Sequence, residues 1–268
     1  MKNFLSLHVD EGPFLATAIH NGHSIRDELL PYLKLGEKER LREEDPFTGE
    51  LVTVGNTQIV VHKSRFEIDL NRSRDKAVYR SAKDAWGLDV WNQALSEDIV
   101  NRSLDTYDQF YATLYKQITR IRNRHGKFVV FDIHSYNHRR DGPDKPPADP
   151  DLNPDINIGT SNMDELTWRP LVNRFISDLR NFSCEDRRLD VRENIKFQGG
   201  HMARTIHNKF FKSGLVLAIE IKKFYMDEWT GESDQSEIDF IGKALSVTTN
   251  GILEELEKVQ NDSANNFV

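Results

Sequence analysis

The chain has 268 residues, with 43 acidic and 36 basic side chains and a formal net charge of −7. Hydrophobic residues make up 38% of it, which is enough to build a core and excludes a chain that is disordered throughout. The single cysteine, Cys184, excludes an intramolecular disulfide and a cysteine-based zinc finger. A transition metal would therefore need histidine and carboxylate ligands.

The same composition limits the partners and the compartment that we expect. An acidic chain without a long basic stripe is a poor candidate for binding nucleic acid. No apolar run approaches the roughly 20 residues that span a bilayer, and the first residues acquire charge too soon for a signal peptide. We expect a cytoplasmic protein with one domain over residues 1–268, without nucleic-acid or membrane partners, and with its oligomeric state open.

Short apolar strands and longer amphipathic helices alternate along the chain. Apolar residues at three- and four-residue spacing predict the helices, and wholly apolar runs predict buried strands. In chain order we expect a strand at 16–20, a hairpin of strands 51–54 and 57–61, a helix at 98–125 ended by Gly126, a strand at 127–134, a helix at 168–182, a strand at 215–221 and a helix at 236–259. Helices between apolar strands indicate an α/β fold with a mainly parallel sheet covered on both faces.

Ionisable side chains lie at the ends of three of these strands. His20 and His23 follow the first, Asp132 and His134 end the second, and Glu220 interrupts the third. Ligands of α/β proteins bind beyond the carboxyl ends of the strands. Two histidines and one carboxylate, with water in the fourth position, are typical of a catalytic zinc site, and a separate carboxylate can act as general base.

Each of these residues also has a structural interpretation. A histidine at a strand end is more often a hydrogen-bonded structural residue than a metal ligand. Asp132 lies two residues before His134 and so shares its face of the strand, where it could orient a metal-bound imidazole or simply anchor a loop. Glu220 could form a buried salt bridge with Arg65 or Arg72 instead of acting on a water molecule.

Residues 65–72 concentrate charge in one segment, and residues 137–154 form a long loop dense in Pro, Asp and Arg. If 65–70 is a strand, alternation places Arg65 on one face with two acidic residues. Arginine suits carboxylate recognition, although a structural ion-pair set with Asp69 and Asp75 is an equal alternative. Gly199-Gly200-His201 offers a flexible backbone beside Arg204, or it is only a turn.

Taken in order, these segments resemble motifs of the N-formylglutamate amidohydrolase family. The matching segments are Ile19-His20-Asn21-Gly22, Glu44-Asp45, residues 64–72 (Ser-Arg-Phe-Glu-Ile-Asp-Leu-Asn-Arg), Asp132-Ile133-His134-Ser135, residues 154–160, Phe197-Gln198-Gly199-Gly200-His201, and residues 218–221 with 225–228. The segment at 202–208 and the loop at 137–154 depart from the family's pattern.

The resemblance implies a zinc carboxypeptidase- and aspartoacylase-like fold, a three-layer α/β/α sandwich with a mixed, mainly parallel sheet. It implies a zinc-dependent amidohydrolase of amino acid metabolism that cleaves the linear amide C–N bond of an N-acyl amino acid such as N-formylglutamate, giving formate and the free amino acid. The implied site residues are His20, Asp45 and His134 for one Zn²⁺, with Glu44 or His23 as alternatives to Asp45; Glu220 as general base and acid; Arg65, Asn71 and Arg72 as a clamp for an anionic small-molecule substrate; and His201 and Arg204 as substrate or oxyanion contacts.

Three other functions stay open at this point. The protein could be a metal-dependent hydrolase of a different N-acyl amino acid or of a peptide. It could be a metal-free hydrolase such as a glycosidase, with Asp132 and Glu220 as the two acids. It could also be a catalytically silent protein that binds carboxylate ligands.

Overall fold

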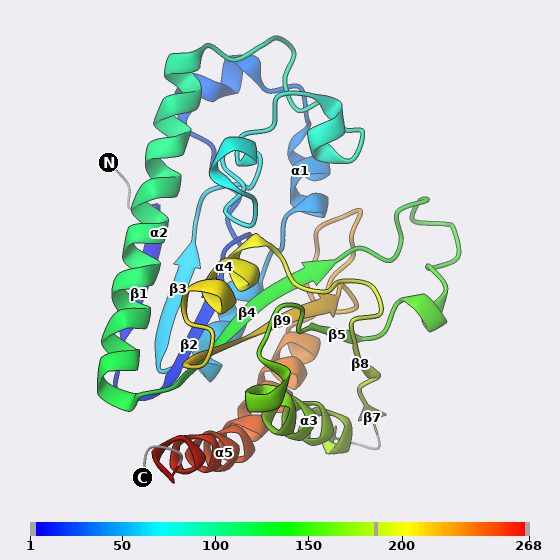
Figure 1. The fold of residues 1–268 in the computed structure, drawn as a ribbon. Helices are drawn as coiled ribbons and strands as arrows, with labels where there is room; N and C mark the ends of the chain where they lie inside the picture. The colour runs from blue at the N-terminus through cyan, green and yellow to red at the C-terminus, as the bar shows by residue number, and fades with distance from the viewer. Residues whose placement is uncertain (1–3, 185–186, 266–268) are drawn as a thin grey trace.

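A seven-stranded sheet forms the centre of the computed structural model, which describes the backbone of residues 4–184 and 187–265 and the side chains within these ranges up to residue 260 (Figure 1). The strands follow the order β1-β3-β2-β4-β9-β5-β8. Their bounds are Leu5–Val9 (β1), Phe14–Ala18 (β2), Thr57–Val61 (β3), Phe128–Tyr136 (β4), Ile156–Gly159 (β5), Val191–Glu193 (β8) and Gly214–Lys222 (β9); β6 (Ser183–Cys184) and β7 (Arg187–Arg188) pair separately.

The sheet is mixed and mainly parallel, as predicted. β3, β2, β4 and β9 run parallel to one another, and β8 runs parallel to β5. β1 is antiparallel to β3, and β5 is antiparallel to β9. The carboxyl ends of β3, β2, β4 and β9 therefore meet at one edge of the sheet.

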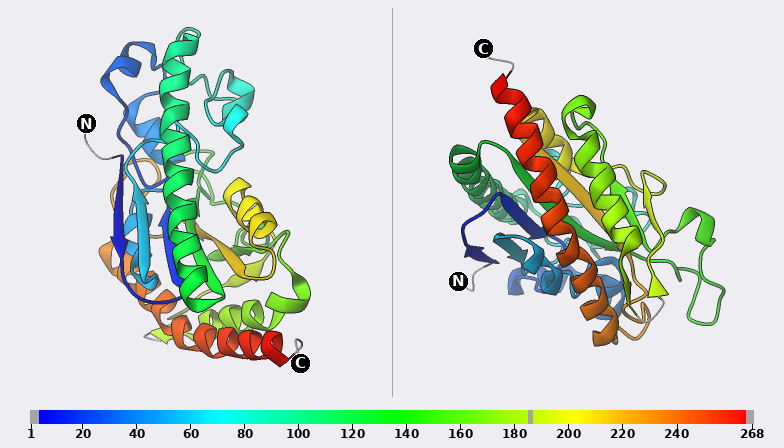
Figure 2. Two further views of the ribbon diagram at one scale, coloured as in Figure 1. Left: turned by 60° about the vertical axis from the view of Figure 1, so that its left-hand side comes forward. Right: turned by 90° about the horizontal axis from the view of Figure 1, so that it is seen from below.

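Helices cover both faces of the sheet, which confirms the α/β architecture. α2 and α4 pack on one face, while α3 and α5 run side by side on the other (Figure 2). Among the described residues, none of the helices has the length and apolar character needed to cross a membrane. The helices are α1 (Glu37–Glu43), α2 (Glu97–His125), α3 (Glu165–Asn181), α4 (His201–Lys209) and α5 (Gln235–Asn265), with 3-10 helices η1 (Asp27–Tyr32), η2 (Thr48–Val54), η3 (Arg74–Lys76), η4 (Ala82–Ala85) and η5 (Pro150–Leu152).

The long helix α2 begins and ends where the sequence predicts. The Ser96 side chain accepts a hydrogen bond from the backbone N–H of Ile99 at the start of the helix. Gly126 follows the last turn with φ of 74°, a conformation that favours glycine. The apolar side of α2, including Phe110 and Leu114, packs on the sheet.

Every residue of β4 is buried, which explains its apolar sequence. Side chains alternate between the two faces: Val130 packs with α2 and α4, whereas Phe131 packs with α3 and α5. Asp132 and His134 are two and four residues after Val130, so their side chains lie on the same face of β4 as that of Val130. They therefore face the layer of α2 and α4, at the carboxyl edge of the sheet.

The predicted hairpin at 51–61 is wrong. Residues 57–61 do form β3, but its partners are β1 and β2, which flank it on both sides. Residues 51–54 lie in the 3-10 helix η2, where Leu51 and Val52 bury their side chains in the core beneath the sheet, together with α5. Both edges of β3 are already occupied, so the preceding segment cannot pair with it.

Candidate active site

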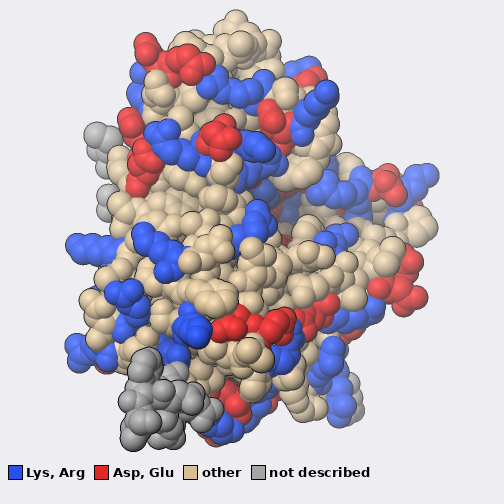
Figure 3. Space-filling view, viewed as in Figure 1, with Lys and Arg blue, Asp and Glu red and all other residues tan. Residues whose placement is uncertain are grey.

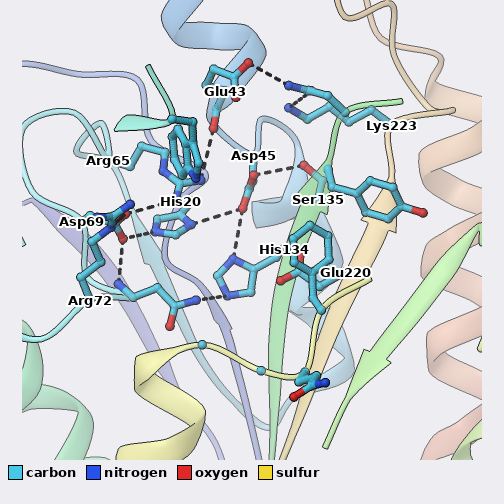
Figure 4. A pocket seen from close by; sticks show the side chains of 18 of the residues that line it. His20, Glu43, Asp45, Arg65, Asp69, Arg72, His134, Ser135, Glu220 and Lys223 are labelled. Carbon is cyan, nitrogen blue, oxygen red and sulfur yellow. Dashed lines mark hydrogen bonds and ion pairs between the residues drawn. The ribbon is translucent and has the colours of Figure 1, made fainter. Parts of the chain in front are cut away.

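Four predicted site residues meet at the carboxyl edge of the sheet, where they line one cavity of about 260 Å³ (Figure 4). His20 follows the end of β2, and His134 lies in β4. Glu220 of β9 pairs with His134 in the parallel register, so both side chains point to the same face. Asp45 comes from the loop after α1, and its backbone N–H donates to the carbonyl of His20 at 2.9 Å.

The Asp45 carboxylate lies between the two imidazoles (Figure 4). Its Oδ2 is 3.4 Å from His20 Nδ1 and 3.1 Å from His134 Nδ1. One ligand atom from each of the three residues falls within 4.8 Å of the others, and all three side chains are buried. His20 Nδ1 has no hydrogen-bond partner among the residues that the structure describes. This group of donors could hold a metal ion.

The outer nitrogen of each imidazole is fixed by a second carboxylate. His20 Nε2 lies 2.8 Å from Asp69 Oδ1, and His134 Nε2 lies 3.0 Å from Asp132 Oδ1. Thr17 Oγ donates to the same Asp132 oxygen at 3.0 Å. With a metal bound, donation of the Nε2 protons outward would leave the Nδ1 lone pairs to the metal, which is the tautomer that a metal ligand needs. The residues present therefore fit a divalent metal with two nitrogen ligands and one oxygen ligand.

The charges of this group are strongly coupled. Burial opposes ionisation of Asp45, but the hydrogen bond from His134 and the charge of His20 lower the pKa of Asp45. Burial likewise opposes a charged imidazole, yet the ion pair and hydrogen bond with Asp132 raise the pKa of His134 well above its usual range. The geometry thus attracts a cation to the space between Asp45 and the imidazoles, whether a proton or a metal ion.

Glu220 is an acid in a deep, weakly solvated position. Desolvation raises the pKa of Glu220 to about 7, although the charge of His134 opposes this rise. The salt bridge considered from the sequence is not formed, because Arg65 and Arg72 both pair with Asp69 instead. A carboxyl group whose pKa is near neutrality can both accept and donate a proton.

The strand predicted at 65–70 is wrong, because the chain turns there. The backbone N–H of Glu67 donates to the Ser64 carbonyl at 2.9 Å, which closes a turn directly after β3. Arg65 and Asp69 therefore lie on one side of the turn, and Arg65 Nη2 donates to Asp69 Oδ2 at 3.1 Å. Arg72 Nε donates to the same oxygen at 3.3 Å. The two interpretations drawn from the sequence are therefore compatible. Arg65 and Arg72 form ion pairs with Asp69, and both also line the cavity.

An aromatic side chain covers the two arginines. The guanidinium of Arg65 lies 4.7 Å from the ring centre of Trp86, and that of Arg72 lies 5.6 Å from it. All three residues line the cavity. Together they form a cationic wall beside the cluster of His20, Asp45 and His134. Figure 3 shows Lys and Arg side chains around a hollow in this face of the molecule.

Two cationic residues of the cavity are not identified from the sequence. Arg140 belongs to the long loop that projects from the body of the molecule (Figure 1), and its Nη2 pairs with Glu43 Oε2 at 2.8 Å. Lys223 follows β9 and donates hydrogen bonds to groups beside Asp45 and His134. The composition of the loop is a signal for Arg140, whereas Lys223 has no signal beyond its place after Glu220.

The turn before α4 and the first residues of that helix contribute less to the cavity than the sequence predicts. Gly199 and Gly200 line the cavity, but His201 and Arg204 are not among its lining residues. The His201 ring packs against Tyr111, and Arg204 Nη1 donates to the Gly199 carbonyl at 2.7 Å. The structure thus brings the backbone of this turn to the cavity, and not the two side chains.

Three further residues bear on alternatives left open by the sequence. His23 hydrogen-bonds to Glu44, which is buried away from the cavity, so the geometry favours Asp45 as the carboxylate of the cluster. Asn71 lines the cavity with its Nδ2 3.4 Å from His134 Nε2. Asp132 is fully buried and does not line the cavity, so it is not placed to act on a substrate with Glu220.

Comparisons with known proteins identify a family and a shared fold. The family model of N-formylglutamate amidohydrolase matches residues 12–226. The crystal structure of N-formylglutamate amidohydrolase from Ralstonia eutropha JMP134 has a TM-score of 0.72 and 19% identity, covering 96% of this chain and 98% of that one. A gene product from Agrobacterium tumefaciens has a TM-score of 0.63 and 18% identity, covering 92% and 95%. No curated protein matches the chain. The chain belongs to the N-formylglutamate amidohydrolase family.

Proposed function

We propose that the protein is a zinc-dependent amidohydrolase that cleaves an N-acyl amino acid, with N-formylglutamate as the first candidate substrate. The observation that carries the proposal is the convergence of His20, Asp45 and His134 in the cavity that Glu220 also lines. Family membership and the fold support the same reaction. The products would be the free amino acid and formate.

The metal would be held by Nδ1 of His20, Nδ1 of His134 and one oxygen of Asp45. When bound, such a metal polarises a carbonyl oxygen and lowers the pKa of water from 15.7 to about 7. Asp69 and Asp132 hold the two imidazoles in the required orientation. Zinc is proposed because two histidines and one carboxylate are the usual protein ligands of a catalytic zinc site.

Glu220 would move the proton. It takes a proton from the attacking water as the C–O bond forms at the acyl carbon. It then gives this proton to the nitrogen of the leaving amine as the C–N bond breaks. A pKa of about 7 suits both transfers near neutral pH, because neither protonation state is rare.

Arg65 and Arg72 would bind a carboxylate of the substrate, with Asn71 beside them. Their guanidinium groups are already held by Asp69 and Trp86, so little side-chain freedom is lost when an anion binds. A protein with net charge −7 thus presents a locally cationic wall to an anionic substrate. Arg140 adds a further cation that lines the same cavity.

The test is a hydrolysis panel with metal-stripped and metal-restored protein. The substrates are the N-formyl, N-acetyl and N-succinyl derivatives of L-glutamate, L-aspartate, L-glutamine and L-leucine, and the released amine is quantified. We expect one equivalent of zinc to restore turnover, with N-formyl-L-glutamate hydrolysed fastest. Turnover that persists in the metal-stripped protein would contradict the proposed requirement for zinc. Thermal stabilisation by these compounds without any turnover would instead favour the silent binding protein.

A further inference from the structure

Lys223 is one of the largest fully buried side chains of the protein, with 1% of its surface exposed. A buried ammonium group is unfavourable unless its hydrogens find acceptors. Lys223 Nζ donates to the carbonyl of Arg42 at 2.6 Å, the carbonyl of Glu44 at 2.7 Å and Asn137 Oδ1 at 2.9 Å. All three ammonium hydrogens are thus used within the protein, so none remains for a substrate.

The acceptors lie on the segments that carry the site residues. Glu44 directly precedes Asp45, and Asn137 follows the strand that carries His134. Lys223 itself follows the strand that carries Glu220, and its backbone N–H donates to the Tyr136 carbonyl at 3.0 Å. Lys223 therefore connects the segments that carry the Asp45, His134 and Glu220 side chains.

Asp45 needs such support more than His134 does. His134 lies within a central strand, whereas Asp45 lies in a loop outside the sheet. On one side, the Asp45 backbone is held by its hydrogen bond to the His20 carbonyl. At the other end of the same peptide group, the Glu44 carbonyl accepts a hydrogen bond from Lys223 Nζ at 2.7 Å. The Asp45 carbonyl is held separately by the Thr48 hydroxyl, at 2.6 Å. Without Lys223, the peptide group that precedes the Asp45 side chain keeps only its hydrogen bond to the His20 carbonyl.

We propose that Lys223 is a positioning residue, which fixes the Asp45 carboxylate against the two imidazoles and so sets the affinity of the site for its metal. This proposal rests on the metal site of the proposed function. Residues that orient metal ligands typically change metal affinity by about 10- to 100-fold when replaced. We therefore expect Lys223→Met to bind Zn²⁺ about 10- to 100-fold more weakly than the unmodified protein.

The experiment compares Lys223→Met with a matched control, Lys127→Met. Lys127 is also a buried lysine, and its Nζ donates to the Lys212 carbonyl at 2.9 Å, but it precedes β4 at the opposite end from His134. Metal-stripped proteins compete for Zn²⁺ with a chromogenic chelator of known affinity. Thermal unfolding of the metal-free proteins measures what each buried lysine contributes to the fold alone. We expect Lys127→Met to lose stability but to keep its zinc affinity.

Each outcome decides between the two proposals. Equal zinc affinity of Lys223→Met and the unmodified protein overturns the role of Lys223 and leaves the metal site intact. An equal loss in both lysine variants overturns it as well, because the effect is then general. Failure of the unmodified protein to bind Zn²⁺ overturns the proposed function together with this role.

A second variant covers the case in which Lys223→Met does not fold. Asn137→Ala removes one of the three acceptors and leaves the ammonium with two carbonyl groups. We expect its zinc affinity to fall several-fold. Unchanged affinity of this variant counts against the proposal.

Discussion

Glu220 is the residue on which the proposed reaction depends most directly. It lines the cavity beside the His–Asp–His cluster but is not one of its three members. We expect Glu220→Gln to lose at least about 100-fold in kcat, because general acid–base catalysis contributes that much or more, and to keep its zinc affinity. Glu193→Gln, at an acid that accepts from Arg169 outside the cavity, is the control. If the Glu220→Gln enzyme stays active, Glu220 is not the general base of the reaction.

The raised pKa of Glu220 also predicts how stability depends on pH in the metal-free protein. The pKa is about 7 in the fold against 4.5 for an ordinary glutamate, so between these values the unfolded chain releases its proton first. Folding is then progressively disfavoured as pH rises, by up to about 3 kcal/mol above pH 7. Glu220→Gln removes this effect. We therefore compare the free energies of unfolding in urea of Glu220→Gln and of the unmodified protein. The value for the variant minus the value for the unmodified protein should be larger at pH 8 than at pH 5. The same difference at both pH values would contradict the raised pKa of Glu220.

Asp69 links the cationic wall to a candidate metal ligand. It binds His20, Arg65 and Arg72 with its two oxygens, and it is 1% exposed. We expect Asp69→Asn to weaken zinc binding about 10- to 100-fold and also to raise KM at saturating zinc, because both His20 and the arginines lose their partner. Asp75→Asn, at an exposed acid nearby, should change neither quantity. A change in KM with unaltered zinc affinity would show that Asp69 orients only the arginines.

At the scale of elements, Gly22 holds two loops of the site together. It forms a parallel bridge with Ser64, so the loop after β2 lies against the loop after β3. A Cβ at Gly22 would lie 2.1 Å from the carbonyl carbon of His62, which is backbone and cannot rotate away. We expect Gly22→Ala to lower the free energy of unfolding by about 1–3 kcal/mol or more, as overpacking does. Gly36→Ala meets only the end of the Glu39 side chain, at 3.3 Å, and should be nearly neutral in the same thermal unfolding experiment.

The elements predicted correctly are those whose signal is local. α2 combines a helical period with a cap at each end, and β4 and β9 are largely apolar because helices cover both of their faces. The hairpin at 51–61 and the strand at 65–70 are wrong because distant contacts decide these segments. The apolar residues of 51–54 pack with α5, and the chain turns after Ser64 to pair Arg65 with Asp69.

The same distinction applies to the site. His20, His134 and Glu220 are candidates from the sequence alone because they stand at the carboxyl ends of apolar strands, where α/β proteins bind their ligands. Asp45 and Lys223 carry no such signal from composition or periodicity. Asp45 lies in a loop, and Lys223 acquires its role only from carbonyl groups that the fold places around it. Motif resemblance supplies Asp45, and only the three-dimensional structure supplies Lys223.

At the scale of the whole molecule, the site joins parts of the chain that are far apart in sequence. His20 follows β2, Asp45 follows α1, and His134 lies in β4 beyond the long helix α2. The three meet only when the sheet is assembled, so the unfolded chain offers no comparable site. A ligand that binds all three residues therefore stabilises the folded state selectively.

Zinc should accordingly raise the thermal stability of the entire protein. At a free zinc concentration 100 times the Kd, the free energy of unfolding should increase by about 2.7 kcal/mol. His134→Ala removes one ligand of the cluster, so we expect its midpoint of thermal unfolding to become nearly insensitive to zinc. His8→Ala, at an exposed histidine of β1, controls for weak binding at surface imidazoles and should keep the full increase. An equal zinc-induced increase in His134→Ala and in the unmodified protein would place the stabilising metal elsewhere.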